Sequence, residues 1–213
     1  MFVRILNLGN MDNNCYIIGD AASGRAAVVD APADASAILE ELELEKLTLS
    51  YILLTHTHFD HIGALDDLRQ ATGACVVVHE FEKDALTDAT VNLSLYADAP
   101  CPKKGADRTV VDKDIIELGQ NQIRVLYTPG HTVGSVCYLA DGMLFSGDTL
   151  FLKDVGRCDF PGGDFSIIKQ SIKKQLYTLP DDTIVYPGHG RQTTIGYEKQ
   201  HNNYIRQDWE YEA

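Results

Sequence analysis

The chain has 213 residues, of which 45% are apolar and 23% charged, the balance of an ordinary globular protein. Its 31 acidic and 18 basic residues give a formal net charge of −13. Because phosphate groups are bound by clustered lysine and arginine, this charge argues against nonspecific nucleic-acid or anionic-membrane binding. No apolar run approaches the length of a membrane span, so the sequence predicts no transmembrane segment.

The five cysteines argue against a disulfide framework or a thiolate zinc site, because their number is odd and no Cys-x-x-Cys occurs. They are Cys15, Cys75, Cys101, Cys137 and Cys158. The first residues show neither the apolar run nor the cleavage site of a signal peptide. Both features indicate a protein of the reducing cytoplasm.

In the first half of the chain, short apolar runs between Gly, Asn and Asp turns predict strands at 2–8, 15–18, 26–29, 50–54 and 75–78. Asp34 is placed to cap a helix, and further helices are expected around 62–71 and after His79. Residues 89–108 have no clear period. A loop of that length in a compact domain is usually a lid or a binding loop.

The second half repeats this plan, with strands predicted at 114–118, 122–128, 135–139, 143–146 and 183–186. A glycine-rich loop covers 147–163, and helices are expected at 166–176 and 194–206. No composition break marks a linker, so we expect one domain over residues 1–213. The order of elements predicts an α+β fold, a β-sandwich covered by helices on both outer faces.

Ligand-type side chains gather just after the predicted strands. His56, His58 and His61 follow the strand at 50–54. Three more such residues sit beside Gly or Pro after later strands: His131, Asp148 and His189. Loops at strand ends are where a rigid scaffold presents catalytic groups. Tight turns at Gly and Pro let the backbone approach a small object closely.

The run Thr-His-Thr-His-Phe-Asp-His at 55–61 has a spacing that metal binding explains well. In an extended loop, His56 and His58 lie on the same side and can bind one ion, whereas Asp60 and His61 can reach a second. Imidazole and carboxylate form a nitrogen and oxygen donor set suited to zinc, iron or manganese. A histidine-rich surface turn is the alternative, but the ligand-type turns downstream favour a metal centre.

Residues 55–61 resemble the Thr-His-x-His-x-Asp-His signature of the metallo-β-lactamase superfamily. Its later motifs are resembled, in the same order, by Gly130-His-Thr-x-Gly-Ser, Ser146-Gly-Asp-Thr and Pro187-Gly-His-Gly. These segments cover the chain from end to end. The resemblance implies a four-layer αββα sandwich, in agreement with the order of the predicted elements.

The same resemblance implies two divalent metal ions, with zinc as the expected metal and iron or manganese as alternatives. The first ion would be held by His56, His58 and His131. The second ion would be held by Asp60, His61 and His189. Asp148 would bridge the two ions. Asp60 would also orient the metal-bound hydroxide that attacks the substrate in a hydrolytic reaction. The remaining histidines, His79 and His201, match no ligand position and are expected to be packed or exposed.

Within the superfamily, the segment from Gly147 to Asp164 and the tripeptide at Asn92 are similar to the short glyoxalase II-like hydrolases. Full-length glyoxalase II adds a C-terminal helical region that holds glutathione. The stretch after His189, with Lys199 and Arg206 as its cations beyond Arg191, is expected to be too short for that region. The resemblance therefore indicates the reaction class more firmly than the substrate.

Three residues are candidates for substrate contact, namely Arg157, Lys153 and Tyr96. Arg157 could bind a substrate carboxylate or support Asp148, but an ion pair with Asp159 inside the loop is the simpler interpretation. Lys153 and Tyr96 could equally be ordinary loop surface.

Two functions of different classes fit these motifs. The first is hydrolysis of a small acyl thioester or ester, in which a metal-bridging hydroxide attacks the carbonyl. The second is oxidation by an iron-dependent persulfide dioxygenase, whose members resemble the same motifs. Its single iron would be held by His58, by His131 or His56, and by Asp148. A noncatalytic metal-binding module is the third possibility, although a structural metal does not require so complete a ligand set.

Overall fold

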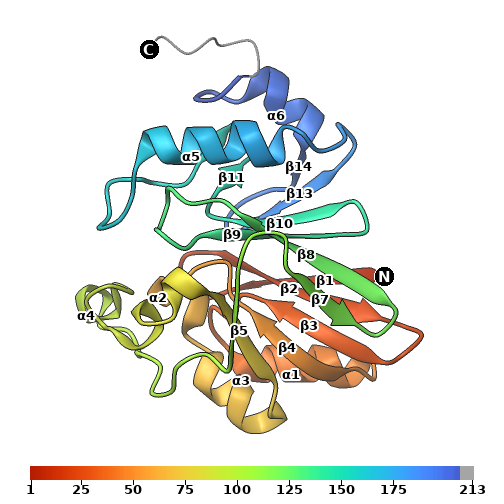
Figure 1. Ribbon diagram of the computed structural model, residues 1–213. Helices are drawn as coiled ribbons and strands as arrows, with labels where there is room; N and C mark the ends of the chain where they lie inside the picture. Colours follow the sequence, from red (N-terminus) through yellow and green to blue (C-terminus); the bar gives the residue numbers. More distant parts are fainter. Residues whose placement is uncertain (207–213) are drawn as a thin grey trace.

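Two six-stranded sheets pack face to face in the computed structural model, which describes residues 1–206 (Figure 1). The first sheet has the order β1-β2-β3-β4-β5-β6, antiparallel up to β3 and parallel beyond it. Its strands are β1 (Phe2–Leu8), β2 (Asn13–Asp20), β3 (Arg25–Val29), β4 (Thr48–Leu53), β5 (Cys75–His79) and β6 (Arg108–Val110).

The second sheet has the order β14-β13-β10-β9-β8-β7, in which only β10 and β13 are parallel neighbours. Its strands are β7 (Ile115–Leu118), β8 (Asn121–Tyr127), β9 (Val136–Ala140), β10 (Met143–Gly147), β13 (Ile184–Pro187) and β14 (Thr193–Thr194). A separate small hairpin joins β11 (Leu150–Phe151) to β12 (Asp154–Val155).

Helices cover the outer face of each sheet (Figure 1). The first sheet is covered by α1 (Ala35–Leu44) and α3 (Leu65–Thr72). The second is covered by α5 (Phe165–Ser171), its π-helical continuation η3 (Ile172–Leu176) and α6 (Ile195–His201). Short elements complete the chain: α2 (Phe59–Ile62), η1 (Glu80–Glu82), η2 (Ala85–Thr87) and α4 (Ser94–Ala97).

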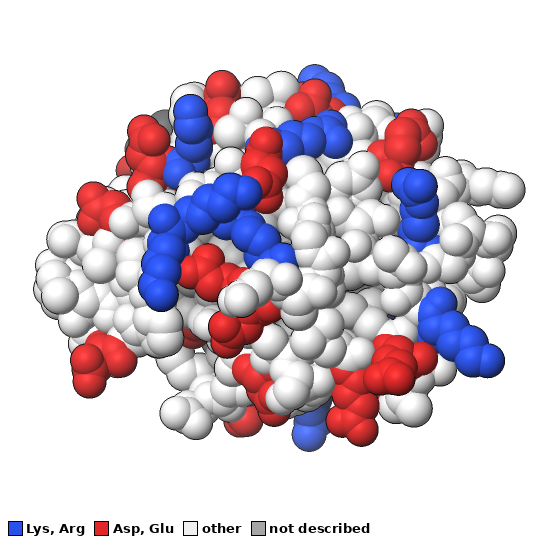
Figure 2. All heavy atoms as spheres, turned by 90° about the horizontal axis from the view of Figure 1, so that it is seen from below, with Lys and Arg blue, Asp and Glu red and all other residues white. Residues whose placement is uncertain are grey.

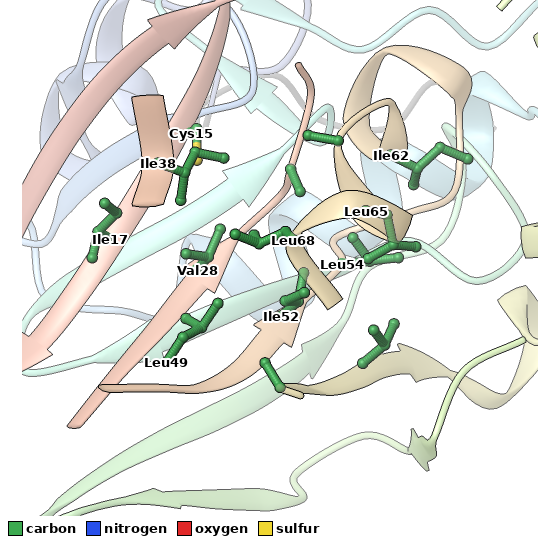
Figure 3. Close-up of a cluster of buried hydrophobic side chains, with 14 of the residues drawn as sticks. Cys15, Ile17, Val28, Ile38, Leu49, Ile52, Leu54, Ile62, Leu65 and Leu68 are labelled. Carbon is green, nitrogen blue, oxygen red and sulfur yellow. The ribbon is translucent and has the colours of Figure 1, made fainter. Parts of the chain in front are cut away.

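Alternation along the strands creates three apolar layers. In β2, Ile17 faces the helices, whereas Tyr16 and Ile18 face the second sheet, because successive side chains point to opposite faces. Figure 3 shows the outer layer, where Ile38 and Leu68 lie against Val28 and neighbouring strand residues. Every residue of β2 is buried, as expected for a strand that is covered on both faces. The predicted four-layer αββα sandwich is confirmed.

Several predicted boundaries are wrong for identifiable reasons. The helix expected at 62–71 is α3 and begins only at Leu65, because the backbone of Ala31 bonds to His61 O and Ala64 N and separates it from the short helix α2. The segment after His79 forms only two 3-10 turns. The helix expected to reach residue 206 ends at His201, where the side chain of Asn202 takes over the hydrogen bonding.

The segment at 89–108 is an irregular loop, as predicted, except for the helical turn α4 and the start of β6. The glycine-rich loop likewise contains the β11–β12 hairpin. These elements were missed because strands of two or three residues and a four-residue helix carry no measurable period. The single-domain organisation stays a prediction, as does the cytoplasmic location. No helix of the described residues is long and apolar enough to cross a membrane.

Figure 2 shows acidic and basic side chains lying next to one another on the face seen from below. Ion pairs of this kind occur in the described chain, where Arg69 and Lys104 both pair with Asp107, at 3.4 and 2.6 Å. Neighbouring charges of opposite sign weaken the long-range field of that face.

We expect Phe145→Ala to lower the free energy of unfolding by about 3–5 kcal/mol, because the ring is fully buried between the sheets against Tyr16 and Tyr186. Urea unfolding of the purified variant measures this change. Leu44→Ala serves as the control and should stay within about 0.5 kcal/mol, since Leu44 is 70% exposed. Equal effects of the two substitutions would show that the inter-sheet layer is not the core.

Candidate metal centre

Loops that follow strands of both sheets bring the ligand-type residues together. The histidine-rich run at 55–61 follows β4, and His131 follows β8. Because β10 and β13 are parallel neighbours, Asp148 and His189 leave the second sheet close together. The carboxyl ends of strands from both sheets therefore supply the cluster.

The first donor group consists of His56, His58 and His131. His58 Nδ1 lies 2.9 Å from His131 Nε2, which lies 3.2 Å from His56 Nε2. All three side chains are buried, and their donor atoms lie within 4.8 Å of one another. Three imidazole nitrogens that converge in this way form a typical donor set for one divalent ion.

The second donor group consists of Asp60, His61 and His189. Asp60 Oδ2 lies 3.3 Å from His189 Nε2 and 3.7 Å from His61 Nε2. His61 is fully buried, whereas Asp60 and His189 are partly accessible. This group therefore offers one carboxylate and two imidazoles beside an open space.

Asp148 lies between the two groups. Its Oδ2 is 3.7 Å from His131 Nε2 and 3.6 Å from His189 Nε2, while its Oδ1 is 3.4 Å from His61 Nε2. One carboxylate thus faces histidines of both groups. Its two oxygens therefore point toward donor atoms of both groups.

The far ring nitrogen of most of these histidines is held by an acceptor that belongs to the protein. The pairs are His61 Nδ1 with Asp30 Oδ2 at 2.9 Å, His131 Nδ1 with Arg157 O at 2.6 Å, His189 Nδ1 with Met11 O at 3.1 Å, and His56 Nδ1 with Thr55 Oγ1 at 3.1 Å. Such partners fix the orientation of the ring, so that the opposite nitrogen points into the cluster.

The electrostatics of the two groups differ. Burial holds the pKa of His56 well below its usual value and lowers the pKa of His58 to about 3, so both rings stay neutral donors. Burial also opposes charge on His61, but Asp148, Asp60 and Asp30 outweigh that effect and raise its pKa. The carboxylates around the second donor group therefore stabilise a positive charge at that site.

Two buried polar atoms of the described residues lie at the centre without a hydrogen-bond partner. They are His61 Nε2 and Asp148 Oδ1. A buried polar atom without a partner is costly, and a cation between these two atoms would satisfy both. Together with the converging lone pairs, this arrangement fits divalent metal ions bound to nitrogen and oxygen donors.

Close backbone approach explains the glycines next to these ligands. A Cβ atom at Gly188 would lie 2.3 Å from Asp148 Oδ1 and 2.8 Å from His61 Cε1. A Cβ atom at Gly156 would lie 1.8 Å from the Asp148 carbonyl oxygen. Any side chain at these positions would displace a donor, so only glycine fits.

Glu82 joins the two loops of the first donor group. Its buried carboxylate accepts hydrogen bonds from the backbone and hydroxyl of Thr57 on one loop. On the other loop it accepts from Thr132 Oγ1 at 2.7 Å and from Gly134 N at 3.1 Å. One carboxylate thus fixes the spacing between the histidine run and the His131 turn.

A cavity of about 540 Å³ opens directly above the cluster. Its base contains His58, Asp60, His131, Asp148 and His189. Cys158 lines the cavity too, but burial and nearby Asp164 and Asp159 raise the pKa of its thiol to about 11. At neutral pH this thiol is protonated and a weak nucleophile.

Of the three predicted substrate-contact residues, one lines this cavity. Arg157 lines it, but its side chain is paired with Asp159 through bonds of 2.7 and 3.0 Å. Lys153 does not line it and lies 5.7 Å from the ring centre of Tyr197 instead. Tyr96 is 72% exposed and also lies outside the lining, although Leu93 from the same loop contributes to it.

The other two histidines lie apart from the cluster. His79 stacks on Tyr127 with ring centres 4.4 Å apart, and its Nδ1 accepts from Phe81 N. His201 stacks on Tyr197 in α6. Neither belongs to a group of donors that could hold an ion among the described residues.

Sequence reasoning missed three residues that support the centre, namely Asp30, Glu82 and Asn13. Asp30 bonds to His61 and Thr55, and Asn13 Nδ2 donates to Asp60 Oδ2 at 3.0 Å. Asp30 follows a predicted strand directly, which was the available signal. Nothing near Glu82 or Asn13 in the sequence indicates where their side chains point.

The sequence profile of the metallo-beta-lactamase superfamily matches residues 8–189. The chain belongs to the metallo-beta-lactamase superfamily. A hydroxyacylglutathione hydrolase of Haemophilus influenzae, GloC, is 32% identical over 212 residues, which cover 96% of this chain and 98% of that protein. A hydroxyacylglutathione hydrolase of a Bradyrhizobium strain is 38% identical over 180 residues, 84% of this chain and 62% of that protein.

Solved structures of the superfamily are similar over nearly the whole chain. BLEG-1, a B3 metallo-beta-lactamase, has 38% identity and a TM-score of 0.91, covering 96% of this chain and 99% of that one. ETHE1 from Myxococcus xanthus has 33% identity and a TM-score of 0.84, covering 97% and 85%. TTHA1623, in a di-iron-bound form, has 32% identity and a TM-score of 0.85, covering 95% and 100%.

We expect Glu82→Ala to lower the free energy of unfolding by about 3–5 kcal/mol, because it leaves buried donors of two loops without an acceptor. Chemical unfolding followed by circular dichroism measures this loss. Glu80→Ala is the matched control, since Glu80 lies two residues away and is exposed. A Glu82 variant as stable as the control would refute the role of this carboxylate in joining the loops.

Proposed function

We propose that this chain is a binuclear metal-dependent hydrolase of small acyl thioesters. The observation that carries the proposal is the pair of donor groups that share Asp148 at the base of an open cavity. The similarity to GloC, named a hydroxyacylglutathione hydrolase, supports the thioester as substrate.

The proposed ligands of the first ion are His56, His58 and His131. Those of the second ion are Asp60, His61 and His189. Asp148 is the proposed bridge. Zinc is the metal of choice for this set of donors, with iron or manganese as alternatives. The di-iron form of TTHA1623 supports a centre of two ions and keeps iron among the candidates.

Divalent ions held in this way supply Lewis acidity, which polarises a carbonyl and lowers the pKa of bound water toward about 7. The residues of the chain have separate tasks around that chemistry. Asp60 lines the cavity, and its proposed task is to orient the attacking water. Asn13 Nδ2 donates a hydrogen bond of 3.0 Å to Asp60 Oδ2 and so holds this carboxylate in place. The buried histidines exclude solvent from beneath the reacting carbonyl.

No side chain in the described cavity is suited to act as the nucleophile. Cys158 is held in its protonated form, and the sequence contains no Gly-x-Ser-x-Gly turn that would present a serine. Attack by water, oriented by Asp60, is therefore the route that the lining supports.

The alternative function is an iron-dependent persulfide dioxygenase. A single iron needs two histidines and one carboxylate, which His58, His131 or His56, and Asp148 provide. The donor set does not separate the two functions, because the dioxygenases resemble the same motifs, so the assay below is used to distinguish them.

We expect about two metal ions per chain in protein purified without chelator. Asp148→Ala should lose metal from both groups and essentially all activity, because its carboxylate faces histidines of both. Elemental analysis together with a turnover assay checks both parts. Retention of both ions and normal turnover would refute the assignment.

His79→Ala and His201→Ala are the controls for this experiment. Both should keep metal content and turnover near those of the parent protein, because each ring stacks on a tyrosine away from the cluster. Loss of a metal equivalent in either variant would mean that the histidines have been sorted wrongly.

A parallel assay separates the two functions. We expect thiol release from lactoyl-glutathione and no oxygen uptake with glutathione persulfide, measured on the same protein loaded in turn with zinc and with iron. Oxygen uptake on the persulfide without thioester hydrolysis would establish the dioxygenase instead.

A further inference from the structure

The walls of the cavity differ sharply from its base. Above the polar cluster, the lining is apolar and largely aromatic, formed by Met11, Phe59, Leu93, Phe151, Val155, Phe160, Phe165 and Tyr204. Pockets that bind small molecules have this composition, with apolar walls that supply affinity and a few polar groups that fix orientation. The side chains of the wall therefore indicate the chemical character of the part of the substrate that does not react.

Three of these side chains are unusually exposed for their size. Phe165 is 43% exposed, Tyr204 47% and Met11 53%. The rings of Phe165 and Tyr204 meet edge to face, with their centres 6.3 Å apart. Large apolar side chains that gather around one cavity gain stability when an apolar ligand covers them. The cavity mouth is thus shaped to be covered by a ligand of the same character.

The charges of the lining residues also favour an uncharged ligand. Among the described lining residues, Arg157 is the only lysine or arginine, and Asp159 already neutralises it through two bonds. Its guanidinium also lies 4.4 Å from the ring centre of Phe160. A substrate carboxylate would lose water on entering and find no unpaired cation, which is unfavourable.

We propose that the preferred substrate carries an uncharged apolar group, about the size of a phenyl ring or a short alkyl chain, which packs against Phe151, Phe165 and Tyr204. This proposal rests on the thioesterase function and narrows it: the glutathione part, with two carboxylates and one ammonium group, is a poor match for this wall. The apolar group belongs either to the acyl half or to the thiol half of the thioester.

Two substrate series distinguish these halves. The first varies the acyl group from acetyl to hexanoyl and phenylacetyl on N-acetylcysteamine. The second keeps the lactoyl group and varies the thiol among glutathione, N-acetylcysteamine and benzyl mercaptan. In the series that varies the half of the substrate that contacts the wall, kcat/KM should rise by about fourfold for each buried methylene. Lactoyl-glutathione should be no better than lactoyl-N-acetylcysteamine by more than about tenfold.

Phe165→Ala tests the wall itself. It should lower kcat/KM for the most apolar substrate by about tenfold or more, with a smaller loss for the acetyl thioester and an unchanged metal content. Ile167→Ala is the matched control, because it lies on the same helix, is also 43% exposed and does not line the cavity. It should leave the preference unchanged.

The outcomes separate this inference from the proposed function. Thioester hydrolysis with a flat response to apolar size in both series, or a thousandfold preference for lactoyl-glutathione, would overturn the apolar site and leave the thioesterase standing. Equal effects of Phe165→Ala and Ile167→Ala would also overturn it. Hydrolysis of no thioester in either series would overturn the proposed function itself.

Discussion

The crowding of seven donor side chains into one buried edge is the constraint on which the rest of the structure depends. Imidazole nitrogens that face one another at 2.9–3.2 Å, and carboxylates removed from water, are costly to bring together unless a cation lies among them. The protein must therefore hold these groups in place from outside the cluster. Asp30, Glu82 and the carbonyl groups of Arg157 and Met11 do so by hydrogen bonds.

The sandwich makes this possible because both sheets end at the same edge. Bonds between the sheets lock their ends together: Val136 N donates to Thr55 O at 2.9 Å, and Asn14 N donates to Gly188 O at 2.8 Å. Each bond lies within one or two residues of a donor loop. The three apolar layers keep the strands from shifting, so displacement of either sheet would move one donor group relative to the other.

The sequence was sufficient to predict the four layers and the residues that form the cluster, but it could not show what surrounds them. A ligand such as His58 lies in a short motif whose spacing is typical of a metal-binding loop. Glu82 bonds to Thr57 and Thr132, which lie 25 and 50 residues away, so its role exists only in the folded chain. Lys153 has a suitable charge in a suitable loop, yet the β11–β12 turn directs it toward Tyr197. Local pattern thus indicates chemistry, whereas tertiary contacts decide orientation.

The base and the wall of the cavity have separate tasks, which explains how one centre can serve several reactions. Relatives and neighbours at 32–38% identity are named a hydroxyacylglutathione hydrolase and a B3 metallo-beta-lactamase, although they share this fold. The donors are confined by strand ends and by glycines such as Gly188 that accept no side chain. Phe165 and Tyr204 belong to the first turn of α5 and to the chain beyond α6, outside the donor loops, whereas Phe151 lies edge to face against His189 with ring centres 6.2 Å apart. Specificity can therefore change at the wall while the base remains intact.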